Sequence, residues 1–225
     1  MAETTKNINS GKQIMEPILI SPHLVYKVNC PVDLTFIAER SAKLLDTIAD
    51  PGEVEQDGGI TSTGHLDAPH LWEEARLLNG WLKGQANKVL EAWDLNFNTF
   101  GITKSWVNSH FEGAWTDTHD HGNSHLVCSV YIQQPKNGGN LEFENKERTL
   151  FAGYPRFAQN QSKLHNYFTE VEVEQGDVVF FPGWLSHRSQ SNKSTQRRIV
   201  MGMNWHCELE RPQQTDNDHI TRQDV

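Results

Sequence analysis

The pattern of hydrophobic residues changes at about Asn98, and this change limits the folds open to the chain. Downstream, short β-branched and aromatic runs alternate with turn signals such as KNGG, EQGD and QSNKST. Closely spaced short strands of this kind are typical of a β-sandwich or barrel. Upstream, residues 31–50 and 67–95 carry apolar residues at near-helical spacing. The sequence therefore predicts helices first and then a β-domain, an α+β fold with the helices packed against one sheet.

The same patterns divide the chain into three parts that form one structural domain. Residues 1–98 are expected to be an N-terminal extension with supporting helices, residues 99–207 the β-rich core, and residues 208–225 a polar C-terminal tail. Within the first part, residues 51–64 are rich in Gly and Asp and are predicted to form a loop.

Charge and cysteine content narrow the classes of function. A net charge of −9 without a basic stripe argues against nucleic acid as a partner. The three cysteines are far apart and form no Cys-x-x-Cys pair, so a disulfide framework or a zinc ribbon is not expected. No apolar run approaches the roughly 20 residues that span a bilayer, and the N-terminus lacks a signal-peptide pattern. We therefore expect a cytoplasmic protein with no membrane partner.

A histidine-rich stretch, WTDTHDHGNSHLVCSVYI, is the first candidate site. It places His119 and His121 two residues apart, and in an extended segment such residues point to the same side. A solvated polar loop would show the same pattern in a chain with 11 histidines. A second stretch, EQGDVVFFPGWLSH, delivers His187 at the end of a distant strand. Two nearby ligands plus one distant ligand on a β-scaffold suit several metals.

A pair of arginines, Arg197 and Arg198, opens the strand-like run RRIVMGMNW. Alternation puts them on opposite faces of that strand. The arginine that faces the inside of a barrel needs an anionic partner, because an unpaired buried charge is costly. Its planar fork matches a carboxylate.

Taken together, these motifs resemble the 2-oxoglutarate/Fe(II)-dependent oxygenases, in particular the prolyl-hydroxylase-like members and a group of oxygenases of similar length. HDH stands at the first metal motif, SVYIQ at the tyrosine-bearing strand and NGGNLEF at the following turn and strand. GDVVFFPGWLSH matches the distal histidine segment, and RRIVMGMNW matches the arginine strand. The likeness covers roughly residues 100–206 and rests on the order and spacing of five short motifs.

The resemblance implies a double-stranded β-helix, a jelly-roll or cupin-like fold, and an Fe(II) dioxygenase with 2-oxoglutarate as cosubstrate. It further implies that His119 and His187 bind iron, while Arg198 and Tyr131 hold the distal carboxylate of 2-oxoglutarate. The expected reaction is hydroxylation of a C–H bond with release of succinate and CO2. A peptidyl, prolyl-type substrate is the leading expectation. The primary substrate and the oligomeric state do not follow from the sequence.

One position departs from the family pattern, because His121 stands where a carboxylate is expected. We expect His121 to be the third ligand, since neutral imidazoles can form a three-histidine site. Asp117 or Asp120 supplying the carboxylate is an alternative, and so is a site with only two protein ligands. His125 is an even number of residues from His119 and His121, so an extended backbone would point it to the same side. It is a candidate for supporting a metal ligand or for facing the substrate. Trp106, Trp184 and Trp205 are candidates for the pocket wall or the core.

Other classes of function remain open at this stage. A cupin-type three-histidine metalloenzyme that does not use 2-oxoglutarate fits Gly176, Pro182 and His187 but lacks the expected Glu of the first motif. A non-catalytic or zinc-binding β-domain is the third reading. Arg198 discriminates among these classes, because 2-oxoglutarate requires it. Residues 51–64 and 158–168 are expected to contact the substrate, on position alone.

Overall fold

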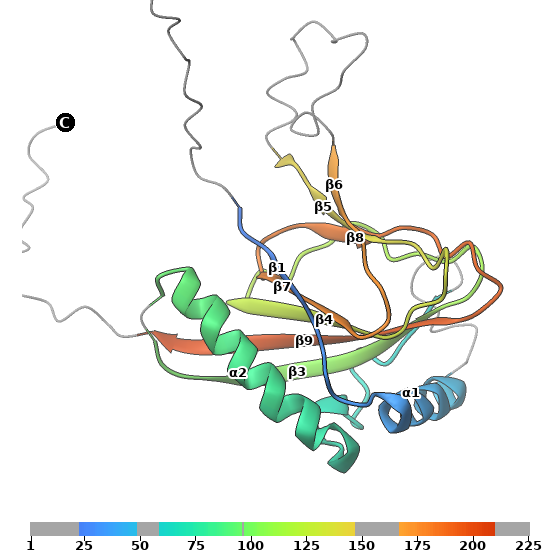
Figure 1. The fold of residues 1–225 in the computed structure, drawn as a ribbon, viewed down its shortest axis with the longest axis horizontal. Helices are drawn as coiled ribbons and strands as arrows, with labels where there is room; N and C mark the ends of the chain where they lie inside the picture. The colour runs from blue at the N-terminus through green and yellow to red at the C-terminus, as the bar shows by residue number, and fades with distance from the viewer. Residues whose placement is uncertain (1–22, 49–58, 96, 147–166, 210–225) are drawn as a thin grey trace, which may run out of the picture.

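The computed structural model describes residues 23–48, 59–95, 97–146 and 167–209. In this part of the chain a six-stranded antiparallel sheet has the order β1-β7-β4-β9-β3-β2, and a smaller sheet has the order β6-β5-β8. Helices α1 and α2 lie on one side of the large sheet, and the small sheet lies on the other (Figure 1). This is the predicted double-stranded β-helix with helices against one sheet.

The element bounds are as follows. The strands are β1 (Tyr26–Asn29), β2 (Gly59–Thr61), β3 (Phe97–His110), β4 (Leu126–Gln133), β5 (Leu141–Glu144), β6 (Phe168–Val171), β7 (Asp177–Pro182), β8 (His187–Ser189) and β9 (Arg198–Leu209). The helices are α1 (Thr35–Ile48) and α2 (Arg76–Ala92), with short 3-10 turns η1 (Pro69–Leu71) and η2 (Glu73–Ala75) before α2.

The start of α1 shows why the predicted helix begins where it does. The Asp33 carboxylate accepts hydrogen bonds from the backbone N of Thr35 at 3.0 Å and from its Oγ1 at 2.7 Å. A side-chain oxygen just before the first turn satisfies an amide that has no partner within the helix. Ile37, Leu44 and Leu45 then face the sheet and are buried. None of the described helices is long and apolar enough to cross a bilayer.

Strand β4 separates two layers of core because both of its faces are covered. Its even-numbered side chains pack with the helices: Leu126, Cys128, Val130 and Ile132. On the opposite face, Val127 and Tyr131 pack toward the small sheet. A strand buried on both sides reads as an almost continuous apolar run, which is the pattern of LVCSVYIQ. The face that carries Val127 and Tyr131 is the inside of the β-helix.

The fold differs from the expectation in one segment. Residues 51–64 were predicted to be a loop, but Gly59–Thr61 form β2, an edge strand paired with the end of β3. A three-residue strand is too short to produce an alternating pattern, so its Gly-rich composition dominated the prediction. Residues 49–58 lie outside the described residues, as do residues 158–166 of the second proposed substrate loop. The division at residues 98 and 207 stays a prediction, although β1 and β2 join the same sheet as the core strands.

Candidate metal and cosubstrate site

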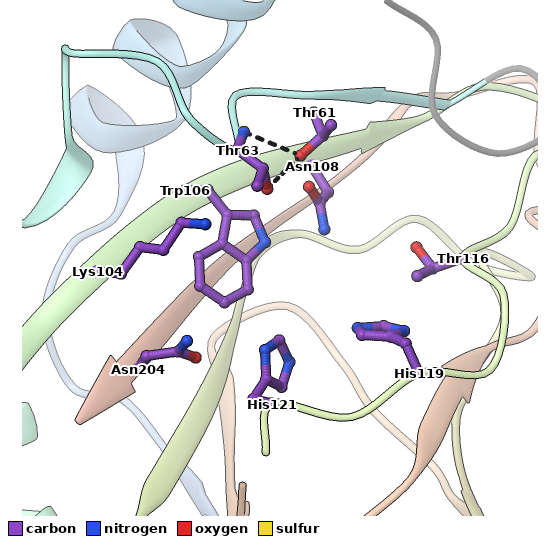
Figure 2. A pocket seen from close by; sticks show the side chains of 9 residues that line it. All are labelled: Thr61, Thr63, Lys104, Trp106, Asn108, Thr116, His119, His121 and Asn204. Atoms are coloured by element: carbon purple, nitrogen blue, oxygen red, sulfur yellow. Dashed lines mark hydrogen bonds between the residues drawn. The ribbon is translucent and has the colours of Figure 1, made fainter. Parts of the chain in front are cut away.

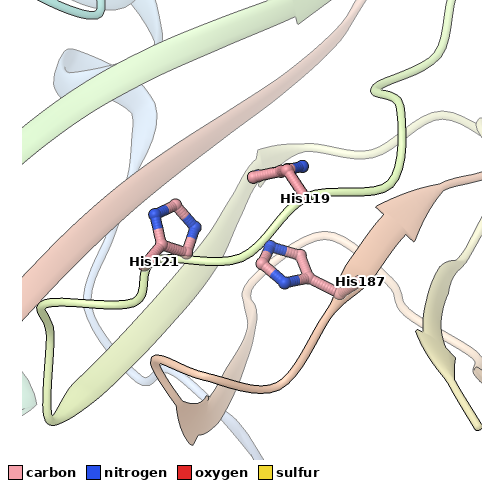
Figure 3. Close-up of side chains that lie close together, drawn as sticks. All are labelled: His119, His121 and His187. Atoms are coloured by element: carbon pink, nitrogen blue, oxygen red, sulfur yellow. The ribbon is translucent and has the colours of Figure 1, made fainter. Parts of the chain in front are cut away.

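Three histidines from two distant segments come together inside the β-helix (Figure 3). His119 and His121 lie on the segment between β3 and β4, and His187 is the first residue of β8. The backbone N of His119 donates to the carbonyl of His187 at 3.0 Å, and the backbone N of His187 donates to the carbonyl of His119 at 2.9 Å. One ring nitrogen from each histidine lies within 4.8 Å of the others. Among the described residues this is the group that can hold a metal ion.

Backbone carbonyls define the tautomer of two of these rings. Nδ1 of His119 lies 2.7 Å from the carbonyl oxygen of Asp117, and Nδ1 of His187 lies 3.0 Å from that of Leu185. A carbonyl oxygen only accepts, so each Nδ1 carries the hydrogen and donates it. Nε2 then keeps its lone pair, which is the usual arrangement of a histidine that binds a metal.

The environment also keeps the cluster in the form that a metal needs. Burial, with a contribution from the neighbouring His119, lowers the pKa of His187 to about 3. The same two causes lower the pKa of His121 to about 4. Both imidazoles are therefore neutral at neutral pH, with lone pairs available for a divalent cation. An imidazole ligand brings no negative charge, so a metal held here would keep its full positive charge for anionic ligands to balance.

These pKa values predict how the metal-free protein responds to acid. A histidine has a pKa of about 6.5 in the unfolded chain, so between that value and its lower folded value the unfolded state binds more protons. Stability is therefore complete above about pH 6.5 and falls as the pH drops toward 4 and 3. Urea unfolding in the presence of a chelator, at pH 7.5 and pH 5, is expected to show this loss. His187→Gln is expected to flatten the dependence, and an unchanged slope in this variant would contradict the assignment.

The two aspartates of the histidine stretch are engaged locally. The Asp117 carboxylate accepts from the backbone N of Thr118, and that of Asp120 accepts from the backbone N of Gly122, each at 3.2 Å. Neither belongs to the group of candidate ligands. Of the three readings of this stretch, the geometry favours the one with His121 as a ligand.

A glycine holds the loop that carries His121. The backbone N of His121 donates to the carbonyl of Gly183 at 2.7 Å. A Cβ on Gly183 would lie 2.0 Å from the carbonyl oxygen of Ser124 and 2.8 Å from that of His121. The Pro-Gly turn after β7 therefore does more than reverse the chain, because only glycine allows this close approach.

Arg198 is the buried cation of the site, with 1% of its surface exposed. Its Nη1 donates to the carbonyls of Gly138 at 2.5 Å and Gln190 at 3.0 Å, and its Nη2 donates to Ser189 Oγ at 2.8 Å. In the described part of the chain no carboxylate forms an ion pair with it. Burial lowers its pKa to about 10, so it stays charged at neutral pH. A buried cation held only by neutral groups is a site for an anionic ligand.

His110 links Arg198 to the segment that carries His119 and His121, two of the candidate metal ligands. Arg198 Nε donates to Nδ1 of His110 at 3.3 Å, which requires the hydrogen of His110 on Nε2. That Nε2 lies 2.7 Å from Thr116 Oγ1 and donates to it. His110 is 3% exposed, and burial together with the Arg198 charge lowers its pKa well below the usual value. The neutral ring thus joins the arginine to a residue three positions before His119.

The turn beside Arg198 depends on glycine as well. Gly139 has φ +82°, and a Cβ there would lie 2.7 Å from the carbonyl oxygen of Gln190 and 2.9 Å from Arg198 Nη1. The NGG motif therefore supplies both a left-handed backbone and room for the guanidinium. Tyr131 lines the same cavity and is 3% exposed, and burial raises the pKa of its hydroxyl.

The cavity floor is a ladder of side chains from three paired strands. Across β3 and β9 the opposing pairs are Lys104 and Asn204, Trp106 and Gly202, Asn108 and Val200, and His110 and Arg198. Strand β4 adds Val127, Ser129 and Tyr131 on the other flank of β9. Gly202 is required here, since a Cβ would lie 2.5 Å from the Trp106 ring. Trp106 consequently lies across β9, with its ring centroid 5.3 Å from that of His121.

The remaining candidates lie elsewhere. Arg197 faces the helix side, where Nη1 pairs with Asp46 of α1 at 2.8 Å. His125 accepts from the backbone N of Cys207 at 2.9 Å and contacts the ring of His206 at a tilt of 39°, so it is not part of the histidine cluster. Trp205 is core, and Trp184 is 49% exposed against His23.

Four cavity residues were missed at the level of sequence: Asn108, His110, Thr116 and Ser189. Asn108 and His110 could have been found from the sequence. In SWVNSHF they alternate with Trp106, and alternate residues of a strand point to the same face. The register of β3 against β9 is what turns that face toward Arg198. The backbone N of Thr116 donates a hydrogen bond to Ser189 Oγ at 2.8 Å. This contact joins distant parts of the chain, so no local sequence pattern predicts it.

Comparison with known proteins finds one family model that is similar to part of this chain. Residues 104–204 match the model of a family described as "Putative 2OG-Fe(II) oxygenase". That segment contains the three histidines, Tyr131 and Arg198. No curated protein is similar enough in sequence to count as a relative. Residues 104–204 are therefore similar to the 2OG-Fe(II) oxygenases, and the resemblance drawn from the motifs is confirmed.

Solved structures share the fold at low sequence identity. AviO1 from Streptomyces viridochromogenes is 16% identical with a TM-score of 0.58, over 84% of this chain and 92% of that one. The non-heme α-ketoglutarate-dependent carbocyclase SnoK of nogalamycin biosynthesis is 15% identical with a TM-score of 0.56, over 83% and 80%. A prolyl-4-hydroxylase from Pseudomonas putida is 14% identical with a TM-score of 0.55, over 84% and 94%. At these identities the likeness concerns the fold.

The chain's own residues fit the metal and cosubstrate of the family, Fe(II) and 2-oxoglutarate. The three histidines offer neutral nitrogen donors on one side of a single cavity, a set suited to iron and to neighbouring divalent metals. Arg198 offers an unbalanced buried charge on the same cavity. A dicarboxylate that binds a metal at one end and a cation at the other matches this arrangement.

Proposed function

We propose that the protein is an Fe(II)- and 2-oxoglutarate-dependent dioxygenase that hydroxylates a C–H bond of its primary substrate. The observation that carries the proposal is the buried Arg198, which has no carboxylate partner in the described chain and faces the same cavity as the histidine cluster. When bound, iron and 2-oxoglutarate supply the oxidation, in which one oxygen atom of O2 enters succinate and the other the substrate, with release of CO2.

In this proposal the protein supplies binding and orientation. His119, His121 and His187 hold the iron through nitrogens whose tautomer the backbone carbonyls fix in at least two cases. Nε of Arg198 donates to His110, Nη1 donates to two backbone carbonyls, and one hydrogen of Nη2 goes to Ser189 Oγ. The second hydrogen of Nη2 is left for the distal carboxylate. The Tyr131 hydroxyl is the second donor to that carboxylate. The burial of Arg198 and Tyr131 strengthens these contacts by excluding water.

The test separates this function from a cupin-type metalloenzyme and from a zinc-binding domain. Purified protein reconstituted with Fe(II) is expected to bind 2-oxoglutarate in anaerobic calorimetry and to form succinate in air. Protein treated with chelator and protein given succinate in place of 2-oxoglutarate are the controls. Iron binding with neither 2-oxoglutarate binding nor succinate formation would leave the cupin-type reading in its place.

For the primary substrate, the resemblance favours a peptidyl, prolyl-type side chain. The Pseudomonas putida prolyl-4-hydroxylase shares the fold, which supports a peptide as one arm of any substrate test. A second pocket, which adjoins the histidines and is described below, favours a different class of substrate.

A further inference from the structure

The cavity continues outward from the histidines into a polar pocket of about 220 Å³ (Figure 2). Its walls come from β3, β9 and the segment at β2, and Thr61 and Thr63 form its upper edge. This volume is below the roughly 300–1,000 Å³ typical of pockets for drug-sized ligands, so it suits a smaller molecule. The metal and cosubstrate positions proposed above do not use Lys104, Asn108, Asn204 or these threonines.

Lys104 gives the pocket a positive charge. Its Nζ lies 5.9 Å from the centroid of the Trp106 ring, at the mouth of the pocket. No carboxylate of the described residues lies within ion-pairing distance of that Nζ. A cation beside a concave site with no local counter-charge attracts an anionic group of a ligand.

Two asparagines add acceptors that need donors. Oδ1 of Asn108 and Oδ1 of Asn204 are buried and accept no hydrogen bond within the described structure. A buried acceptor without a donor costs about 1–3 kcal/mol, and such groups in native proteins are usually satisfied by a ligand or by water. Both side chains line this pocket, with Asn204 paired across the strands with Lys104.

Trp106 connects the charged end of the pocket to the histidines. Its ring lies between the Lys104 ammonium and His121, with 5.3 Å between the Trp106 and His121 ring centroids (Figure 2). The flat indole is an apolar surface for a short carbon skeleton. A small molecule anchored at Lys104 would therefore extend its carbon atoms over the indole toward the cluster.

We propose that the primary substrate is a small free carboxylic acid that also carries an ammonium or hydroxyl donor, as amino acids and hydroxy acids do. Its carboxylate pairs with Lys104, its donors satisfy Asn108 and Asn204, and its reacting C–H lies over Trp106 beside the histidines. This assignment rests on the proposed oxygenase function. An internal prolyl residue of a peptide has neither a free carboxylate nor an N–H, so it would leave Lys104 and both asparagines unmatched.

The experiment uses the full chain loaded with Fe(II) and 2-oxoglutarate under anaerobic conditions. The probes are the free amino acids and simple hydroxy acids, the methyl ester of each, the N-acetyl form of each amino acid, and a proline-containing peptide. Binding is measured by the thermal shift and by saturation-transfer NMR. At least one free acid is expected to bind, and its ester is expected to bind at least about 10-fold more weakly.

Matched lysine variants assign the contact. Lys104→Met is expected to weaken the binding of that acid at least about 10-fold, while 2-oxoglutarate still binds. Lys83→Met is the control, because Lys83 is also an exposed lysine over an aromatic ring, Phe100, but does not line the pocket. Asn204→Leu is expected to weaken the binding of the free acid more than the binding of an analogue that lacks the ammonium or hydroxyl donor.

Several outcomes overturn the inference. These are binding of no free acid, equal binding of an acid and its ester, binding of the acid unaffected by Lys104→Met, or binding of the peptide in place of every acid. Binding of 2-oxoglutarate, measured in the same samples, distinguishes a failure of the substrate assignment from a failure of the proposed oxygenase function. If 2-oxoglutarate binds and the acids do not, this substrate assignment fails alone. If 2-oxoglutarate does not bind, the proposed function fails and the assignment with it.

Discussion

Replacing His187 by alanine is expected to weaken iron binding by more than about 100-fold and to abolish succinate formation. The loss of a ligand exceeds the 10–100-fold effect of disturbing a residue that merely supports one. His187 is also the residue that joins the distant β8 to the first histidine segment, so no neighbouring side chain can replace it. Iron content after reconstitution and desalting measures the effect, and circular dichroism shows whether the fold is kept.

A histidine of the same stretch provides the control. His125→Ala removes an imidazole that bonds to the backbone of Cys207 and lies outside the cluster, so iron content is expected to stay near that of the unaltered protein. Full iron binding by the His187 variant would contradict the three-histidine assignment. Loss of iron in both variants, with the fold intact, would contradict it as well.

Replacing Arg198 by methionine is expected to raise the concentration of 2-oxoglutarate needed for binding by about 30-fold or more, with iron content unchanged. Removing one partner of a buried charge pair costs about 2–5 kcal/mol, and each 1.4 kcal/mol is tenfold in affinity. Arg198 also satisfies the carbonyls of Gly138 and Gln190, so the variant is expected to lose stability too. Calorimetric titration with 2-oxoglutarate, on protein of verified fold, separates the two effects.

Three further variants make the test specific. Arg198→Lys keeps the charge but loses the fork that reaches His110 and Ser189, so it is expected to bind 2-oxoglutarate with intermediate affinity. Tyr131→Phe removes one donor and is expected to have a smaller effect than Arg198→Met. Arg197→Met is the matched control, since this neighbour pairs with Asp46 on the helix side. If Arg197→Met and Arg198→Met affect 2-oxoglutarate equally, the carboxylate does not bind at Arg198.

Much of the fold was predictable because its longer elements carry strong local signals, either an apolar run or a helical period. Strand β4 is the LVCSVYIQ run itself, and α1 begins two residues after Asp33, as the capping residue indicates. The strand β2 was missed because three residues cannot display a period. Its place in the sheet comes from pairing with β3, between residues 47 to 51 positions apart, which no local pattern encodes.

The candidate site was partly predictable for a related reason. Alternation along RRIVMGMNW correctly separated Arg198, on the cavity face, from Arg197, on the helix face. The same alternation rule gave a wrong prediction for His125. A turn at residues 122–123 interrupts the extended backbone after His121, so His125 no longer points to the side of His119 and His121. His110 was missed because its role depends on the register that sets it opposite Arg198.

The two backbone hydrogen bonds between His119 and His187 have a consequence for how the protein acquires its metal. Two of the three proposed ligands are placed by the fold itself, through the bridge that joins the segment before β4 to strand β8. The entropy of bringing them together is spent during folding and does not have to be supplied by the metal. We therefore expect metal uptake to need no folding step, in contrast to small zinc domains that are unfolded without their ion. If the three histidines hold iron as proposed, we expect the metal-free protein to stay folded and to bind the ion again when it is supplied.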